Sequence, residues 1–240
     1  MKVGLLIKNF SLLNKITRKI KNAEFNLKHL KNIPTFAHDV DVIITDKELG
    51  NSIIPYIYPN NLEILELKIR SAYYDKRNLT LGIDPGGICG LAVLSNGHVL
   101  FESEYDNINS MTQVIESIND EIGIEQIKIG MGSPPERNII EQSLKNYEEK
   151  IFFVDEKRSG SGSHIEAAVR IAARYAYKEK PNEYRPKSGE ISWIQKQSRR
   201  LSKGLITVNK KTAEMILTGK ISMEDAIENY TQTLVKKNNP

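Results

Sequence analysis

Asp84 is the residue of this chain whose setting is most suited to chemistry. It closes the apolar segment 79–84, and Pro85, Gly86 and Gly87 follow directly. A carboxylate at the end of a buried strand is held rigidly, and glycines beside it let a phosphate or another backbone come close. Such a carboxylate is a ligand for a hard divalent cation. The order Asp-Pro-Gly is also common in ordinary turns, so both interpretations stay open from this residue alone.

Two later segments also carry side chains that can bind a metal ion. Asp155 and Glu156 follow the apolar run 151–154, and because strand residues alternate between faces, only one of these carboxylates is expected to point at a shared site. His164 and Glu166 open an alanine-rich helical segment after a loop of glycines and serines. An imidazole ligates Mn²⁺ or positions a water, although it is a poorer Mg²⁺ ligand than a carboxylate. The alternative for His164 is an ordinary polar residue at a helix start.

Basic side chains accompany these segments. The candidates for phosphate contacts form two groups, which are Lys157 with Arg158 and Lys196 with Arg199 and Arg200. The loop 157–163 suits either a grip on a phosphate backbone or a surface loop. Trp193, on the same helical segment as the second group, is either a stacking surface for a base or a core anchor.

Charge is distributed unevenly along the 240 residues, although the net charge is only +4. Residues 1–77 carry 13 Lys and Arg against 8 Asp and Glu, a net +5. Residues 78–180 carry 10 against 16, a net −6, and residues 181–240 carry 11 against 6, a net +5. Basic arms attract a polyanion, and a metal ion lets carboxylates approach it. The pattern is typical of an enzyme that acts on a polyanion with metals, or of solvated surface charge.

Several classes of protein are excluded or disfavoured by composition. The single cysteine, Cys89, excludes an internal disulfide framework and a cysteine-rich zinc site. No apolar run approaches the roughly 20 residues of a membrane-spanning helix. The first apolar stretch is too short for a signal peptide, so a cytoplasmic protein is expected. A glycine-rich loop of the P-loop type is absent from the sequence.

Periodicity and turn signals predict an α/β protein in three parts. Residues 1–68 are expected to form a small basic α/β domain, followed by a basic linker over 69–78. Residues 78–180 are expected to form three antiparallel strands, with a hairpin turn at Asn96-Gly97. A helix, a strand, a helix, a strand and a helix should follow in that order. Residues 181–240 predict a basic helical region.

Three motifs in this middle part carry a resemblance. Gly82-Ile83-Asp84 closes its first strand, Asp155-Glu156-Lys157-Arg158 closes its last strand, and His164-Ile165-Glu166-Ala167-Ala168 opens its last helix. Together with the element order they resemble the RNase H fold, and within it the RuvC and YqgF branch of Holliday-junction resolvases and their relatives. The departure is His164, which stands where YqgF proteins have an aspartate.

The resemblance implies metal-assisted hydrolysis of phosphodiester bonds in structured nucleic acid, with DNA favoured over RNA. Asp84 would bridge two Mg²⁺ or Mn²⁺ ions, and Glu156 and His164 would complete the ligands, with Asp155 or Glu166 as further candidates. A homodimer is plausible because a junction has two equivalent strands to cut. The alternatives are a nucleic-acid-binding protein whose active site has decayed, and an actin-like ATPase or sugar kinase, which would need a second copy of the fold.

Overall fold

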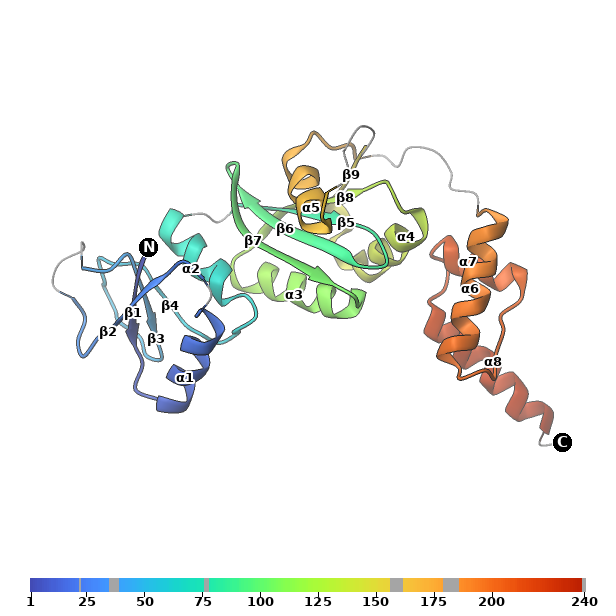
Figure 1. Ribbon diagram of the computed structural model, residues 1–240, viewed down its shortest axis with the longest axis horizontal. Helices are drawn as coiled ribbons and strands as arrows, with labels where there is room; N and C mark the ends of the chain where they lie inside the picture. Colours follow the sequence, from blue (N-terminus) through green and yellow to red (C-terminus); the bar gives the residue numbers. More distant parts are fainter. Residues whose placement is uncertain (22, 35–38, 76–77, 156–161, 179–185, 239–240) are drawn as a thin grey trace.

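The protein is an α/β structure whose three parts follow one another along an elongated chain (Figure 1). The α/β class expected from the sequence is confirmed. The residues that this computed structural model describes are 1–21, 23–34, 39–75, 78–155, 162–178 and 186–238, with side chains as far as residue 232.

The N-terminal part is a parallel sheet of four strands in the order β2-β1-β3-β4. Its strands are β1 (Lys2–Leu6), β2 (Asn26–His29), β3 (Val42–Thr45) and β4 (Tyr56–Ile57). Helix α1 (Phe10–Lys19) connects the first two strands and begins after Asn9, whose side chain accepts the N–H of Leu12 at 3.1 Å. Ile16 and Ile20 then pack into the core of this sheet.

Helix α2 (Leu65–Tyr74) occupies most of the segment for which the sequence predicts a basic linker, and that prediction is wrong. Leu65 and Ile69 pack into the core of the N-terminal sheet, whereas Ile64 and Leu67 pack into the core of the middle part. Both sides of the helix are therefore apolar, which conceals the single-face periodicity by which a surface helix is recognised. The helix joins the first two parts of the chain.

The middle part is a mixed sheet of five strands in the order β7-β6-β5-β8-β9. Its strands are β5 (Leu79–Asp84), β6 (Cys89–Ser95), β7 (His98–Tyr105), β8 (Ile124–Gly130) and β9 (Ile151–Val154). β6 is antiparallel to β5 and β7, whereas β5, β8 and β9 are mutually parallel. Asn96 and Gly97 have φ angles of 49° and 80°, which confirms the predicted hairpin.

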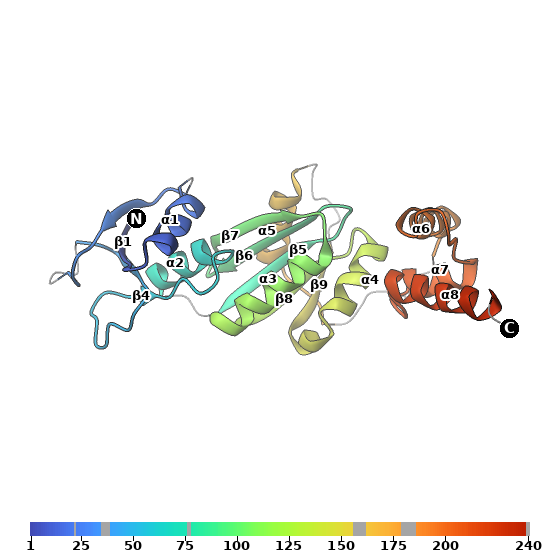
Figure 2. The ribbon, with the colours of Figure 1, turned by 90° about the horizontal axis from the view of Figure 1, so that it is seen from below.

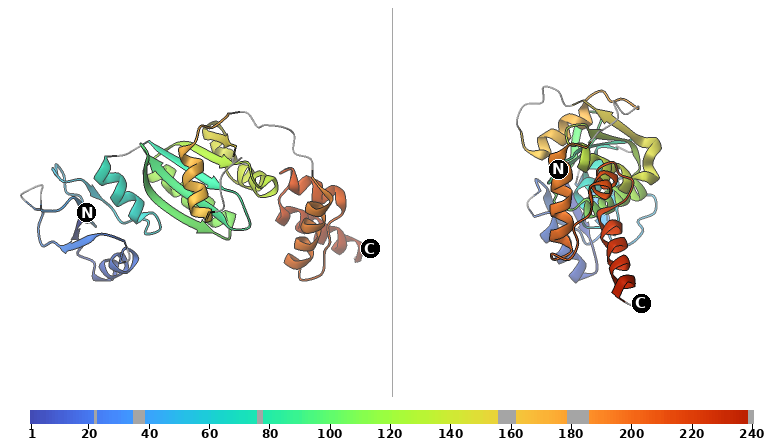
Figure 3. Two further views of the ribbon diagram at one scale, coloured as in Figure 1. Left: turned by 45° about the horizontal axis from the view of Figure 1, so that its top comes forward. Right: turned by 90° about the vertical axis from the view of Figure 1, so that its right-hand side faces the viewer.

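Helices cover both faces of this sheet (Figure 2). Helices α3 (Ile108–Glu121) and α4 (Pro134–Ser143) pack on one face, where they enclose the main hydrophobic core with the apolar side chains of the strands. A 3₁₀ segment, Lys145–Lys150, leads from α4 into β9. Helix α5 (His164–Ala173) lies across the other face (Figure 3).

Helix α5 approaches the sheet closely because two strand positions have no side chain. A β-carbon built on Gly82 would lie 2.2 Å from the carbonyl oxygen of Ala168, and one on Gly90 would lie 2.1 Å from that of His164. Both distances are far below van der Waals contact. The small side chains of Ala168 and Ala172 complete this contact with Ala92 and Leu94 of the sheet.

The C-terminal part consists of α6 (Ser188–Leu201), α7 (Lys210–Leu217) and α8 (Met223–Asn238), which share a hydrophobic core of their own. The buried side chain of Asn138 in α4 donates a hydrogen bond of 2.5 Å to the carbonyl oxygen of Leu217. A backbone carbonyl at the end of α7 is thereby bound to the middle part of the chain.

Replacing Gly82 by alanine should destabilise the protein, because the added carbon must displace the backbone of α5. We expect Gly82→Ala to lower the free energy of unfolding by at least about 2 kcal/mol, as measured by urea denaturation. The matched control is Gly87→Ala, whose added carbon meets nothing within 4 Å. Equal stability of the two variants would contradict the close contact.

Candidate functional site

The side chains of Asp84 and His164, which are 80 positions apart in the chain, meet at one edge of the middle sheet. Nδ1 of His164 lies 2.9 Å from Oδ2 of Asp84. Asp84 is the last residue of β5 and is buried, whereas the side chain of His164, the first residue of α5, remains 45% exposed. The pair therefore combines a sheltered carboxylate with an imidazole that solvent can reach.

The contact orients the imidazole. An ionised carboxylate only accepts hydrogen bonds, so the contact with Asp84 requires a hydrogen on Nδ1 of His164. In the neutral ring, Nε2 then carries the free lone pair. Such a nitrogen can take a proton from water or bind a metal ion, and the carboxylate behind the ring fixes its orientation.

The other predicted ligands are not brought to this pair in the part of the chain that the structure describes. Glu166 instead lies 3.9 Å from Arg170, one helical turn further along α5, and its side chain is 65% exposed. Its backbone N–H is bound by the hydroxyl of Ser163, which caps the helix. Glu156 lies outside the described residues, as do the predicted phosphate contacts Lys157 and Arg158.

Among the described residues, no group of three or more His, Cys, Asp or Glu side chains is placed to hold a metal ion. Of the four predicted metal ligands, Asp84 and His164 meet, Glu166 lies against Arg170, and Glu156 is outside the described residues. Asp155, which precedes the undescribed segment, contributes its carbonyl oxygen to a hydrogen bond of 3.3 Å from Arg174.

Glu136 is an acidic residue near this edge that the sequence interpretation missed. It lies in the first turn of α4, directly after β8, and accepts a hydrogen bond of 2.5 Å from the hydroxyl of Ser133. Burial raises the pKa of the Cys89 thiol, a hydrogen bond to the carbonyl of Gly86 opposes this, and the negative charges of Glu136 and Asp84 raise the pKa further. Both carboxylates therefore act on the start of β6.

A sequence signal for Glu136 does exist. The segment 133–136 reads Ser-Pro-Pro-Glu and follows an apolar strand, which is the pattern of a helix start with an acidic residue three positions after the cap. The parallel strands β5 and β8 are neighbours, so residues that follow their carboxyl ends gather at one edge of the sheet.

The basic group on α6 lies at the surface, as a phosphate contact requires. Lys196, Arg199 and Arg200 are exposed, and Trp193 is 43% exposed, so the interpretation of Trp193 as a core anchor is wrong. The buried side of this helix is formed by Ile191, Ile194 and Ser198 instead. Trp193, Lys196 and Arg200 have the spacing i, i+3, i+7, which places them on one helical face.

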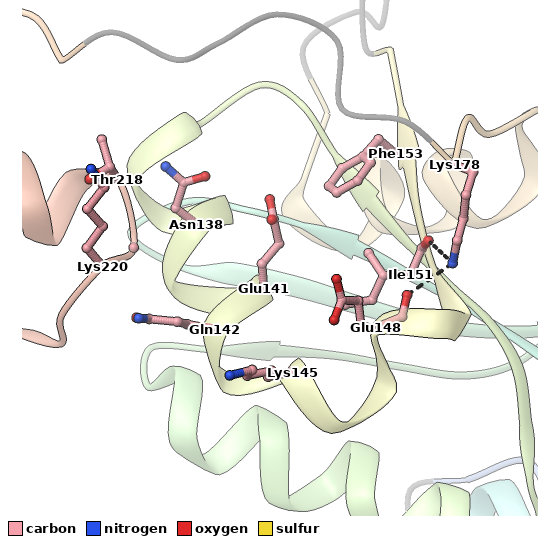
Figure 4. A pocket seen from close by; sticks show the side chains of 11 residues that line it. Asn138, Glu141, Gln142, Lys145, Glu148, Ile151, Phe153, Lys178, Thr218 and Lys220 are labelled. Carbon is pink, nitrogen blue, oxygen red and sulfur yellow. Dashed lines mark hydrogen bonds between the residues drawn. The ribbon is translucent and has the colours of Figure 1, made fainter.

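A cavity of about 700 Å³ lies elsewhere, beside α4, β9 and the turn after α7 (Figure 4). Its charged lining mixes both signs and includes Glu141, Glu148, Lys145 and Lys220. Another lining residue, Lys178, binds the carbonyl oxygens of Glu148, Glu149 and Ile151 at 3.0, 2.6 and 3.3 Å. These contacts are structural, and the lining does not include the Asp84–His164 pair.

Comparison with known proteins identifies no relative: no family model, no curated protein and no solved structure matches this chain. Among the helices that the structure describes, none combines the length and apolar character needed to cross a membrane.

Lys128 of β8 fixes the far end of the helix that carries His164. Its Nζ donates to the carbonyl oxygens of Ala172 and Arg174 at 2.8 and 2.7 Å, and burial lowers the pKa of this amine. These carbonyls belong to the end of α5, where helical partners are lacking.

Substitution of Lys128 by methionine keeps the length of the side chain but leaves both carbonyls without this donor. We expect Lys128→Met to lower the free energy of unfolding by about 1–3 kcal/mol and to speed amide exchange in the last turn of α5. Lys210→Met, which removes an exposed amine from α7, should change stability by less than about 0.5 kcal/mol. Unaltered exchange in α5 would show that Lys128 does not hold the helix.

Proposed function

We propose that the protein is a divalent-metal-dependent nuclease that hydrolyses phosphodiester bonds in structured nucleic acid, in the manner of Holliday-junction resolvases. The observation that carries the proposal is the contact between Asp84 and His164 at the end of the central strand of the middle sheet. Asp84 and His164 are two of the three residues that the resemblance identifies as catalytic.

The topology supports the RNase H-like part of this proposal. Three antiparallel strands come first, β8 and β9 then add in parallel beyond β5, and α5 crosses the face opposite α3 and α4. The first strand is therefore central, and its last residue, Asp84, lies at the edge of the sheet where the parallel strand β8 also ends and β6 begins. Gly82 and Gly90 support the same assignment, because they allow the start of α5 to reach this edge.

The donor set fits a divalent cation that accepts both oxygen and nitrogen ligands. Asp84 and His164 would hold it together with Glu156, and Mn²⁺ suits a carboxylate and imidazole set better than Mg²⁺ does. When bound, the metal would lower the pKa of a water and stabilise negative charge on the phosphate. Glu136, in the first turn of α4 after β8, is a further candidate carboxylate, since its charge and that of Asp84 both act on Cys89.

The protein's own groups have distinct tasks in this proposal. Asp84 holds the imidazole of His164 through Nδ1, which leaves the lone pair of Nε2 for the metal ion. The turn beside the pair leaves room for a substrate, since a β-carbon on Gly87 would meet nothing within 4 Å. The backbone of a nucleic acid can therefore approach without moving a side chain at that position.

The acidic middle part lacks affinity for a polyanion. In this proposal the affinity comes from the face of α6 that carries Trp193, Lys196 and Arg200. Trp193, Lys196 and Arg200 combine a flat aromatic surface with two positive charges, which suits a base beside phosphates. DNA is favoured over RNA as the partner, and a homodimer would match the two equivalent strands of a junction.

The strongest alternative is a nucleic-acid-binding protein without activity, which is favoured by the lack of a three-residue metal cluster among the described residues. An actin-like ATPase or sugar kinase is disfavoured. Such proteins need a second copy of the fold, whereas the N-terminal sheet is wholly parallel and differs from the mixed middle sheet.

Loss of either member of the pair should abolish cleavage. We expect Asp84→Asn and His164→Ala each to slow Mn²⁺-dependent cleavage of a synthetic four-way DNA junction by at least about 100-fold. Glu166→Gln is the matched control and should retain activity, because Glu166 contacts Arg170 rather than Asp84.

Calorimetric titration of Mn²⁺ separates the proposal from its alternative. If the protein is a nuclease, the wild-type protein should bind Mn²⁺ and the Asp84→Asn variant should not. Junction binding by the wild-type protein without cleavage and without Asp84-dependent uptake of Mn²⁺ would favour the decayed protein instead.

The α6 face should contribute electrostatically to binding. We expect Lys196→Ala with Arg200→Ala to weaken junction binding and to reduce the slope of log affinity against log salt by about 2, since each lost phosphate contact removes about 1. Lys15→Ala with Lys19→Ala removes the same charge from α1 and should leave this slope unchanged. Equal slopes for both double variants would exclude the α6 face as a phosphate contact.

A further inference from the structure

The end of α7 is held against α4 by a buried polar contact. Asn138 of α4 is 7% exposed, and its side-chain amide donates to the carbonyl oxygen of Leu217 at 2.5 Å. Leu217 is the last residue of α7, where carbonyl groups lack helical partners. A β-carbon built on Gly219 would lie 3.3 Å from the carbonyl oxygen of Asn138, so the turn after α7 also lies against α4. Figure 4 shows Asn138 on the side of α4 that faces Thr218 in this turn.

Apolar packing does not define this α4–α7 contact. Among the described residues, each hydrophobic core belongs either to the C-terminal part or to the parts before it, and none combines side chains of both. The cavity of about 700 Å³ lies on the flank of the contact, between α4 and the turn after α7. The orientation of the C-terminal part on α4 therefore depends chiefly on the directional hydrogen bond of Asn138.

Within the C-terminal part, the position of α7 determines that of α6. Val208 lies just before α7, and its N–H donates to the buried hydroxyl of Ser198 in α6 at 3.1 Å. The side chain of Gln195 in α6 donates to the carbonyl oxygen of Val208 at 3.0 Å. Ile194 of α6 and Ile216 of α7 share one core. The face that α6 presents to solvent is therefore fixed relative to the end of α7.

On the other side of the contact, α4 leads back to the candidate site. The helix begins at Pro134, shortly after β8 ends, and Asn138 lies about 6 Å along the helix from that residue. Ile140 packs into the core of the middle part and so fixes α4 to the sheet. β8 is the parallel neighbour of β5, which ends at Asp84. The C-terminal part is thus attached on the side of the sheet where the Asp84–His164 pair lies, away from the N-terminal part (Figure 1).

Two binding groups that belong to one rigid body act together on one ligand. A polyanion held by the α6 face is presented to the second site at a spacing that the protein sets, and its effective concentration there exceeds that of a free substrate. If the contact between the two parts is loose, the spacing varies and part of this advantage is lost. A constant spacing also determines which phosphodiester bond lies at the pair.

We propose that Asn138 is a positioning residue, which fixes the α6 face at a constant spacing from the Asp84–His164 pair so that both act on one nucleic-acid molecule. This inference rests on the proposed nuclease function and adds to it how the cleaved bond is selected. The bond at the pair lies at a set distance from the phosphates that α6 binds. Asn138 is buried against α7 and acts through that helix.

The experiment measures Mn²⁺-dependent cleavage of a synthetic four-way DNA junction that is end-labelled on one strand, so that rates and cut positions are read together. Asn138→Leu replaces the amide by an apolar side chain of similar size and removes the donor. We expect this variant to raise KM at least about fivefold and to leave kcat within about twofold of the wild-type value. Cuts that the wild-type protein concentrates at one bond should spread over neighbouring bonds. Uptake of Mn²⁺ in calorimetry should be unchanged, because the Asp84–His164 pair is untouched.

Three further variants isolate the α4–α7 contact from general damage. Gln142→Leu removes an amide from an exposed position one turn further along α4, and it should match the wild-type protein. Gly219→Ala disturbs the other side of the contact, because Gly219 has a φ of 70° and the added carbon approaches the carbonyl of Asn138. It should reproduce the effect of Asn138→Leu. Gly204→Ala is its control, since Gly204 also has a positive φ, of 91°, but the added carbon meets nothing within 4 Å.

The outcomes separate this inference from the proposed function. If the wild-type protein cleaves no junction, the proposed function fails and the positioning role fails with it. If the wild-type protein cleaves but Asn138→Leu and Gly219→Ala match their controls in KM and cut position, only the positioning role is overturned. Scattered cuts by the wild-type protein, or a loss of kcat or of Mn²⁺ uptake in Asn138→Leu at unchanged KM, would also overturn it. Should Asn138→Leu fail to fold, the comparison of Gly219→Ala with Gly204→Ala decides the question.

Discussion

The close contact of α5 with the middle sheet is the constraint on which the candidate site depends. His164 reaches Asp84 only because the helix lies almost on the strand backbones, and it can do so only where Gly82 and Gly90 present no side chain. Lys128 fixes the opposite end of the same helix. The position of one imidazole thus depends on two missing side chains and on one partly buried amine, none of which takes part in the chemistry that we propose.

The three parts of the chain have different physical roles around this site. α2 contributes to two hydrophobic cores at once, so the N-terminal sheet is attached to the middle part by apolar packing. The C-terminal helices have their own core and contact α4 through the hydrogen bond of Asn138. Because α4 also carries Glu136 in its first turn, one helix links the C-terminal part to the acidic edge of the sheet.

The edge at which β5, β8 and β9 end gathers the features that suit a nucleic-acid enzyme. Asp84 and His164 supply the groups for the chemistry that we propose, and Glu136 adds a carboxylate in the first turn of α4. The parallel direction of the three strands explains the gathering, since residues that follow their carboxyl ends come to one side of the sheet whatever their separation in sequence. The positive charge needed to hold a polyanion lies on other elements, including α6.

The sequence by itself determined the local features, namely a strand that ends in Asp84, the hairpin at Asn96-Gly97 and the α/β class, because periodicity and turn chemistry depend on neighbouring residues. Only the tertiary structure decided that His164, and not Glu166, contacts Asp84, although both lie in the first turn of α5. It also decided that Trp193 is exposed and that α2 is buried on two sides. The reason is physical: which side of a helix is covered depends on the elements that pack against it, and these come from distant parts of the chain.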